Sequence, residues 1–402
     1  MTVLPLHTRR LLRSTIAGLV LSGTSLLAQE VPIRDLPHPS KEIGDPFSLI
    51  VAAREYRPGE LLVSDGVEAQ VSLVDFARST RTNVGRKGAG PGEYTIAAGL
   101  FRLRGDTLWI LDGTGGAGGG AARIVAFGPD LKPGATFSVQ LFDQQDTTVV
   151  QGAMFGDTRG RLYSTALKFR MGPSGAIIPD SMDLVWFDPR AGTRTERTLI
   201  ARVRTPSTGK QDIQNQGGNI KVSTPFPGLV PADAWAAFPD GRVAIVRGAS
   251  YRVEFILPNG VRPAPTTIPY ERFKVTEEDK KAELDAIRRQ TAEQMVMVRK
   301  MMPPGVTLEV TVAPPPSWPA EYPPLALLGA IPAPNGDLWV RRSVPARLDR
   351  ERWDVIDRSG KLVARWQLPP RISLVAVGTG GVYTVRSDED DLRYVQRVDL
   401  PN

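Results

Sequence analysis

The sequence predicts an all-β fold, a six-bladed β-propeller made of four-stranded antiparallel blades. Three observations lead to this prediction. The 402 residues include 39 glycines and 35 prolines, a content typical of many tight turns and short strands. A pair of strand-like motifs recurs six times, and without two insertions the copies repeat about every 50 residues, which suits a propeller blade. No helical pattern separates the strands of a unit, which excludes a parallel βαβ sheet.

The first motif of each unit is a turn containing glycine, followed by a β-prone run that starts with Leu or Val. The starting residues are separated by 47, 54, 81, 95 and 44 residues. They are Leu61, Leu108, Leu162, Val243, Leu338 and Val382. The two long intervals contain insertions at residues 205–230 and 270–323, which account for the departures from the common period.

The second motif is an alternating strand that ends in a polar turn, as at residues 183–189 and 352–357. The two motifs together give two hairpins, and therefore four antiparallel strands, in each unit. The last unit shows only three strands, at residues 374–377, 382–386 and 392–399. Because an open ring leaves exposed strand edges, we expect the alternating residues 30–36 to supply the fourth strand.

The amino terminus has the layout of a secretory signal peptide. Arg9, Arg10 and Arg13 precede an uncharged, mainly apolar run at residues 14–28. That run is too short and too interrupted for a membrane span, which needs about 20 apolar residues. We predict cleavage near residue 28 and export to the periplasm or the extracellular space. After cleavage, residues 29–402 would form a single propeller domain. The alternative is an uncleaved membrane anchor.

Composition excludes several classes of site. The chain has no cysteine, so disulfides, zinc fingers and thiol catalysis are excluded. Its two histidines are His7 and His38, too few for a multi-histidine metal site. Only His38 would remain after cleavage, in a proline-rich segment, and no G-x-S-x-G elbow occurs, so we predict no serine triad. The remaining 47 basic and 43 acidic residues are scattered, which predicts no nucleic-acid partner. We also predict no cofactor.

Two short motifs resemble ligand sites. Residues 113–118 match the G-x-G-x-x-G dinucleotide pattern, but a strand follows where that pattern needs a helix, so we interpret them as a hairpin turn. The acidic residues 388–391 lack the glycine and the distal glutamate of a calcium loop, and we interpret them as a solvated turn.

The insertion at residues 270–323 is helical and then rich in proline, and it lies between the fourth and fifth units. Thr276 and three following acids are typical of a helix start, and one apolar face continues to residue 302. The methionine-rich end is apolar on more than one face and must be covered, either by docking on the propeller or by a partner. The candidate interaction surface consists of Met295, Met297, Met301, Met302, Trp318 and Tyr322.

The junction between the first two units, residues 85–94, resembles the G-P-G-E-aromatic junction of secreted bacterial six-bladed propellers of the NHL-like group. Residues 240–243 and 335–340 resemble the blade signatures of that group. The resemblance covers roughly residues 45–400 and implies the fold. Members of the group are largely uncharacterised, so it implies no particular chemistry.

Two functions remain. The first is a monomeric, non-enzymatic binding scaffold for a protein, peptide or glycan. The second is a calcium-dependent hydrolase or lyase similar to six-bladed lactonases, which hold calcium with oxygen ligands from the innermost strands. We predict these strands at residues 48–53, 97–101, 152–155, 232–238, 325–331 and 374–377. Their only acid is Asp233, too few ligands for calcium, so we favour binding and predict no catalytic or metal-binding residue.

Overall fold

A computed structural model of the chain describes residues 31–113, 121–143, 148–168, 170–172, 175–177, 179–191, 196–205, 212–226, 229–301 and 305–401. The predicted signal peptide and most of the glycine run at residues 113–118 lie outside these ranges. The residues from Pro32 onward belong to one compact unit, which is the subject of all that follows.

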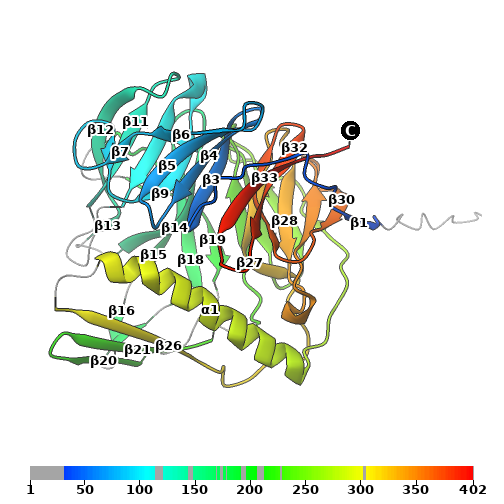
Figure 1. Cartoon of the computed structure of the whole chain (residues 1–402). Helices are drawn as coiled ribbons and strands as arrows, with labels where there is room; N and C mark the ends of the chain where they lie inside the picture. Colours follow the sequence, from blue (N-terminus) through cyan, green and yellow to red (C-terminus); the bar gives the residue numbers. More distant parts are fainter. Residues whose placement is uncertain are drawn as a thin grey trace, which may run out of the picture. The chain divides into compact units, whose positions relative to one another are not determined.

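Six mainly four-stranded antiparallel sheets are arranged as a β-propeller, as the sequence predicted (Figure 1). Blade 1 consists of β3 (Ile50–Arg57), β4 (Glu60–Asp65), β5 (Gln70–Asp75) and β6 (Thr80–Val84). Blade 2 consists of β9 (Ala97–Arg102), β10 (Leu108–Asp112), β11 (Ala121–Phe127) and β12 (Pro133–Gln140). Blade 3 consists of β14 (Thr148–Gly156), β15 (Leu162–Lys168), β18 (Ser181–Phe187) and β19 (Thr198–Arg204), with β13 (Phe142–Asp143) beside β14.

The other three blades follow the same order. Blade 4 consists of β22 (Ala234–Ala237), β23 (Val243–Arg247), β24 (Arg252–Ile256) and β25 (Thr266–Thr267). Blade 5 consists of β27 (Leu325–Pro332), β28 (Leu338–Arg342), β29 (Arg352–Ile356) and β30 (Leu362–Gln367). Blade 6 consists of β31 (Ile372–Gly378), β32 (Gly381–Ser387), β33 (Arg393–Asp399) and β2 (Lys41–Glu42). The first full strand of each blade contacts its counterparts in neighbouring blades, so these strands form the inner ring.

The ring closes with a different segment from the one predicted. β2 completes blade 6 by pairing antiparallel to β33, whereas β1 (Ile33–Asp35) adds to blade 5 by pairing parallel to β30. The expectation that residues 30–36 complete the last blade is therefore wrong. The physical reason is Leu36, which is buried in the apolar cluster between blades 5 and 6 and holds the preceding residues against β30.

The core lies between successive blades rather than in one central mass. In β4, Leu62 packs toward blade 2, while Leu61 and Val63 pack toward blade 6. Successive side chains of a strand point to opposite faces of its sheet, and both faces of each blade are covered by a neighbour. This explains why the first motif of each unit is a continuous apolar run instead of an alternating one.

The glycine-rich junction is a compact loop between blades 1 and 2. Its short strands β7 (Arg86–Lys87) and β8 (Glu93–Tyr94) pair in parallel. Gly85 has a φ of 69°, and a Cβ there would lie 2.5 Å from the carbonyl oxygen of Gly92. Both the backbone conformation and the space therefore require glycine at this position.

The two insertions fold together into one unit, which we call the appendage. β20 (Asp212–Gln216) and β21 (Asn219–Pro225) come from the first insertion, and α1 (Glu277–Met301) and β26 (Thr307–Ala313) from the second. β21 pairs in parallel with β26, with Asn219 opposite Thr307 and Pro225 opposite Ala313, and α1 contacts β26. Another short hairpin lies between β15 and β18 of blade 3. It consists of β16 (Arg170–Gly172) and β17 (Gly175–Ile177). No helix formed by the residues that the structure describes has the length and apolar character needed to cross a membrane.

Candidate functional site

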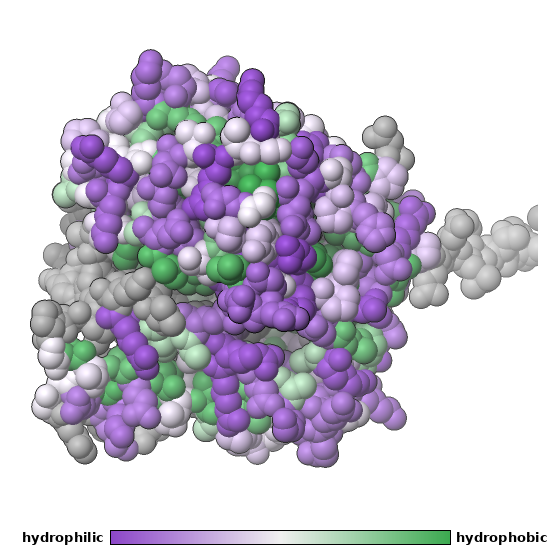
Figure 2. All heavy atoms as spheres, in the orientation of Figure 1, coloured by the Kyte–Doolittle hydropathy of each residue, from purple (hydrophilic) through white to green (hydrophobic). Residues whose placement is uncertain are grey.

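A cavity of about 910 Å³ lies between α1 and the loops at one end of the propeller. Leu325 and Ile372, the first residues of the innermost strands of blades 5 and 6, line it, as does the loop between β28 and β29. We call this end of the propeller, where the innermost strands begin, the mouth. Figure 2 shows a mainly hydrophilic surface around α1, with a recess between the helix and the propeller.

The first turn of α1 is fixed to blade 5. The N–H and the hydroxyl of Thr276 donate to the carboxylate of Asp279, and the N–H of Asp279 donates back to the Thr276 hydroxyl. The same carboxylate forms an ion pair with Arg347 in the blade 5 loop. Burial acts to raise the pKa of Asp279, but these partners hold it below its ordinary value. The helix start predicted from the sequence is thus confirmed, and it anchors the appendage to the propeller.

Part of the cavity lining is apolar. Its apolar lining comes from α1, from the segment before blade 4 and from the mouth. The side chains include those of Leu229, Val230, Ile287, Leu325 and Val344. The volume lies within the range of small-ligand pockets, about 300–1,000 Å³, and such pockets combine an apolar wall with a few polar groups. The cavity can therefore accept an apolar group of a small ligand or of a peptide side chain.

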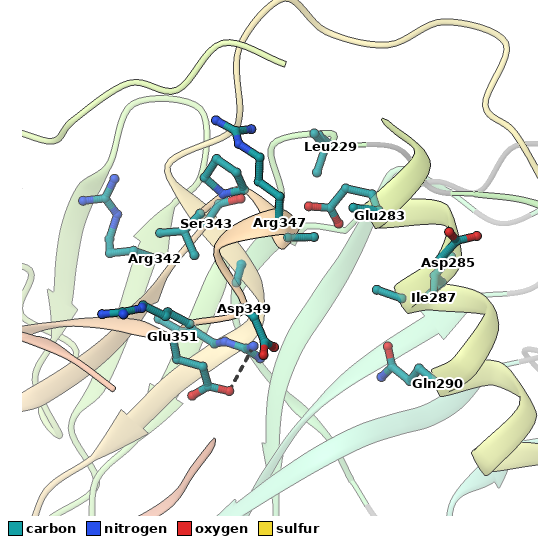
Figure 3. Close-up of a pocket in the computed structure, with 18 of the residues that line it drawn as sticks. Leu229, Glu283, Asp285, Ile287, Gln290, Arg342, Ser343, Arg347, Asp349 and Glu351 are labelled. Atoms are coloured by element: carbon teal, nitrogen blue, oxygen red, sulfur yellow. Dashed lines mark ion pairs between the residues drawn. The ribbon is translucent and has the colours of Figure 1, made fainter. Parts of the chain in front are cut away.

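Charged side chains line the cavity as well. Figure 3 shows Ile287 and Gln290 pointing from α1 toward the loop that carries Asp349. Among the residues described, Arg289 on α1 and Asp349 and Arg350 on the loop are exposed and form no hydrogen bond or ion pair through their side chains. The side chains of Asp349 and Arg350 can bind a ligand without giving up a partner, whereas Arg289 also interacts electrostatically with Asp285.

Two other acids in the cavity are already engaged. Glu351 forms an ion pair with Arg341 and accepts hydrogen bonds from the Trp353 indole and the Leu374 N–H. Burial raises the pKa of Glu283, which lies beside Tyr322. Burial and the Glu283 carboxylate in turn raise the pKa of Tyr322. Glu351 therefore has a structural role, and Glu283 lies beside the buried Tyr322 hydroxyl, which forms no hydrogen bond with a described residue.

The predicted interaction residues lie at two separate places. Met295 is 9% exposed and lies where α1 meets β26, whereas Trp318 packs against Phe226 with ring centroids 5.4 Å apart. Tyr322 is 4% exposed and lies near Glu283, twelve positions from Met295, about 18 Å along a helix at 1.5 Å per residue. The side chains of Met297 and Met301, and the whole of Met302, lie outside the part of the chain that is described.

The innermost strands contain more charged residues than the sequence predicted. All six innermost strands occur where they were predicted, but β3 continues past residue 53 to Arg57 and so contains Arg54 and Glu55. Glu55 therefore lies in an innermost strand, whereas Asp233 lies one residue before β22, so the prediction that Asp233 is the only acid of these strands was wrong. β3 pairs with β4 in unbroken register from Ala52 to Glu55, so the strand continues past the alanines, which the sequence pattern did not reveal.

Neighbouring side chains and backbone groups already bind the carboxylates of Glu55 and Asp233. Glu55 is buried and accepts hydrogen bonds from the N–H and hydroxyl of Thr379 and from the Tyr383 hydroxyl. Asp233 forms an ion pair with Arg247. Within the described ranges there is no group of three or more His, Cys, Asp or Glu side chains that could hold a metal ion.

Arg54 is the exception in the inner ring. Its side chain is partly buried, and no described residue forms a hydrogen bond or an ion pair with it. Burial alone lowers its pKa from 12.5 to about 10. An unpaired buried cation costs folding free energy, so Arg54 is the least compensated charge of the inner ring.

Sequence reasoning missed two carboxylates near the mouth. Asp65 accepts hydrogen bonds from the N–H groups of Ser48 and Leu49, and Asp112 accepts from those of Thr95 and Ile96. Each Asp ends the second strand of its blade and holds the start of the innermost strand. A sequence signal exists, because an aspartate follows the apolar run in both units, after Ser64 in the first and directly in the second. Both carboxylates accept hydrogen bonds from backbone N–H groups and are therefore not free to bind a ligand.

No protein-family model and no curated protein matches this chain. The chain is similar to solved structures at 8 to 14% identity. The calcium-binding protein regucalcin from Agrobacterium tumefaciens is 10% identical over 92% of this chain and 98% of its own, with a TM-score of 0.39. A streptogramin B lyase is 10% identical over 90% and 87%, with a TM-score of 0.36. A member of the DUF4221 family from Bacteroides vulgatus is 8% identical over 93% and 98%, with a TM-score of 0.44. These likenesses concern the fold alone.

Proposed function

We propose that the protein is an exported, non-enzymatic binding propeller of the NHL-like group whose ligand binds in the cavity beneath α1. One observation carries the proposal. Two insertions, far apart in the sequence, combine into an appendage that places a helix over the mouth and encloses about 910 Å³. The signal-peptide layout of residues 1–28 supports export, and the junction at residues 85–94 supports the group.

The side chains of the cavity indicate a ligand with an apolar body and an acidic end. Ile287 and its apolar neighbours can hold the body. The guanidinium group of Arg350 forms no hydrogen bond or ion pair with a described residue, and that of Arg289 is exposed and interacts only electrostatically with Asp285. Guanidinium groups bind carboxylates, sulfates and phosphates with strong, charge-assisted hydrogen bonds. An acidic part of a protein, peptide or glycan has this chemistry.

The anionic aromatic dye 8-anilinonaphthalene-1-sulfonate tests the site, because it combines an apolar body with a sulfonate. We expect saturable binding of one dye molecule per protein in a fluorescence titration. Ile287→Glu and Arg350→Glu should each weaken binding about tenfold, the effect of about 1.4 kcal/mol. Lys87→Glu changes the charge equally on an exposed residue of blade 1's junction and should leave binding unchanged. Equal binding by all variants would contradict the proposal, as would the absence of saturable binding.

The calcium-dependent hydrolase or lyase makes a different prediction. Calcium coordination needs six to eight oxygen ligands in most sites, and the inner-ring carboxylates are engaged by Thr379, Tyr383 and Arg247. Calorimetric titration with calcium chloride should therefore show no stoichiometric binding. Tight binding of one ion per protein would overturn the proposal in favour of the metal-dependent enzyme.

A further inference from the structure

The appendage sheet has an unpaired edge along β26. In a strand, the N–H and C=O of alternate residues point to opposite edges. The N–H of Thr307 donates to the Gly218 carbonyl, and the Ala313 carbonyl accepts from Phe226, so the odd-numbered residues face β21. Leu308, Val310 and Val312 therefore direct their backbone groups to the other edge. The sheet order is β20-β21-β26, and no described strand lies beyond β26.

A groove runs along this edge. A cavity of about 450 Å³ is lined by four consecutive residues of β26, from Glu309 to Val312. Consecutive side chains point to opposite faces, so a cavity that touches all four must follow the backbone edge. The opposite wall is one face of α1. It is formed by Arg288, Thr291, Ala292, Met295 and Arg299. This groove is distinct from the cavity at the mouth, because the two share no lining residue.

The helix side of the groove is cationic. Arg288 lies with its Nε and Nη2 atoms 3.4 Å from the carbonyl oxygen of Val312, at the end of the free edge. Arg299 is exposed and forms no ion pair with any residue that the structure describes. The one acid of the groove, Glu309, is 3.5 Å from Lys221 of β21. Arg288 is also 3.9 Å from the Asp285 carboxylate. The groove therefore offers the Arg299 guanidinium, the Arg288 guanidinium with its existing partners, an apolar contact at Met295, and unpaired backbone groups of Leu308 and Val310.

We propose that this groove binds an extended, acidic peptide segment of a partner protein as an additional strand on β26. The peptide backbone bonds to the free N–H and C=O groups of Leu308 and Val310, which is the β-augmentation mode of peptide recognition. Its apolar side chains pack against Met295, and its carboxylates pair with Arg288 and Arg299. A second copy of this chain fits less well, because pairing β26 with itself would bring the guanidinium groups of both copies together.

Selection from a random decapeptide phage library against the purified protein tests the proposal. We expect enriched sequences that alternate apolar and acidic residues, and the enriched peptide, labelled with fluorescein, is then titrated by fluorescence anisotropy. Val310→Pro removes an N–H from the free edge but none from the pairing with β21, and proline is tolerated at such edges. It should weaken binding about tenfold through the lost hydrogen bond and the disturbed edge. Val310→Ala keeps the N–H and is the matched control, with a smaller loss.

Charge reversal gives a second test that does not depend on the proline variant. Arg299→Glu should weaken the peptide about tenfold, whereas Lys87→Glu should not. Three results would overturn the proposal. The first is the absence of any enriched peptide. The second is equal binding by the Val310→Pro and Val310→Ala variants together with no effect of Arg299→Glu. The third is a dimer in sedimentation equilibrium that Val310→Pro dissociates. The last result would assign the edge to a second copy.

Discussion

Replacing Arg123 should destabilise the propeller at the junction between blades 1 and 2. Its guanidinium group lies 2.8 Å from the Asp112 carboxylate, whose side chain is fully buried, and donates to the carbonyl oxygens of Gly88, Ala89 and Glu93. Arg123→Met keeps most of the side-chain volume but removes all of these donors. The Asp112 carboxylate would remain buried without its cation.

Removing one partner of a buried ion pair costs about 3–5 kcal/mol. We expect about 3 kcal/mol, the lower end, because the Arg123 side chain is 16% exposed and Asp112 keeps two backbone donors, Thr95 and Ile96. Urea unfolding followed by tryptophan fluorescence gives the change in free energy of unfolding. Hydrogen exchange of the amides of residues 85–94 should show the loss locally, since the loop is held by the same side chain.

The matched control is Arg202→Met. Arg202 pairs with Asp183 at 3.0 Å, but its side chain is 75% exposed, and an exposed pair contributes about 0–1 kcal/mol. Adding Asp112→Asn to Arg123→Met should recover part of the loss, because the buried charge disappears. The reasoning would be refuted if Arg123→Met cost no more than Arg202→Met, or if the second substitution recovered nothing.

Two further predictions concern the titration of buried groups. Arg54 has a pKa of about 10, below the 12.5 of the unfolded chain, so its charge opposes folding at every pH below about 10, and this cost disappears as the pH rises toward 12.5. Arg54→Met should raise the free energy of unfolding at pH 7 by about 2 kcal/mol, and an unchanged or lower value in urea unfolding would show that the charge is compensated. Asp279 has a pKa below 3.8, so its contribution to anchoring α1 is present above pH 3.8 and is lost as the pH falls through the lowered value. Asp279→Asn should weaken hydrogen-exchange protection of the first turn of α1 at pH 7, and full protection in the variant would contradict the anchoring role of Arg347.

The blades could be predicted because their signal is local. The run Leu61, Leu62 and Val63 is apolar at every position since both faces of β4 are covered, and the same pattern recurs in each unit. The start of α1 could be predicted for the same reason, because Thr276 and Asp279 are three positions apart and cap each other.

The remainder depends on pairing between distant segments. β21 and β26 pair in parallel, and parallel strands need no tight turn between them, so the sequence holds no local signal that joins the two insertions. The choice of β2 over β1 to close the ring follows from the burial of Leu36, a tertiary effect. The cavity at the mouth could not be predicted because it exists only once the appendage has formed, and Arg289 and Arg350 have no sequence pattern that would single them out.

Protection of a single thiol tests most directly whether the ligand site is the cavity beneath α1. The chain has no cysteine, so Gln290→Cys introduces one thiol at a position that lines the cavity, and Lys87→Cys introduces one far from it in the sequence. The rate of alkylation by N-ethylmaleimide is measured with and without saturating 8-anilinonaphthalene-1-sulfonate. The account predicts that the dye slows alkylation of the Gln290→Cys variant about tenfold or more, since bound dye covers the thiol, and leaves the Lys87→Cys variant unchanged. Equal rates for the Gln290→Cys variant with and without bound dye would contradict it.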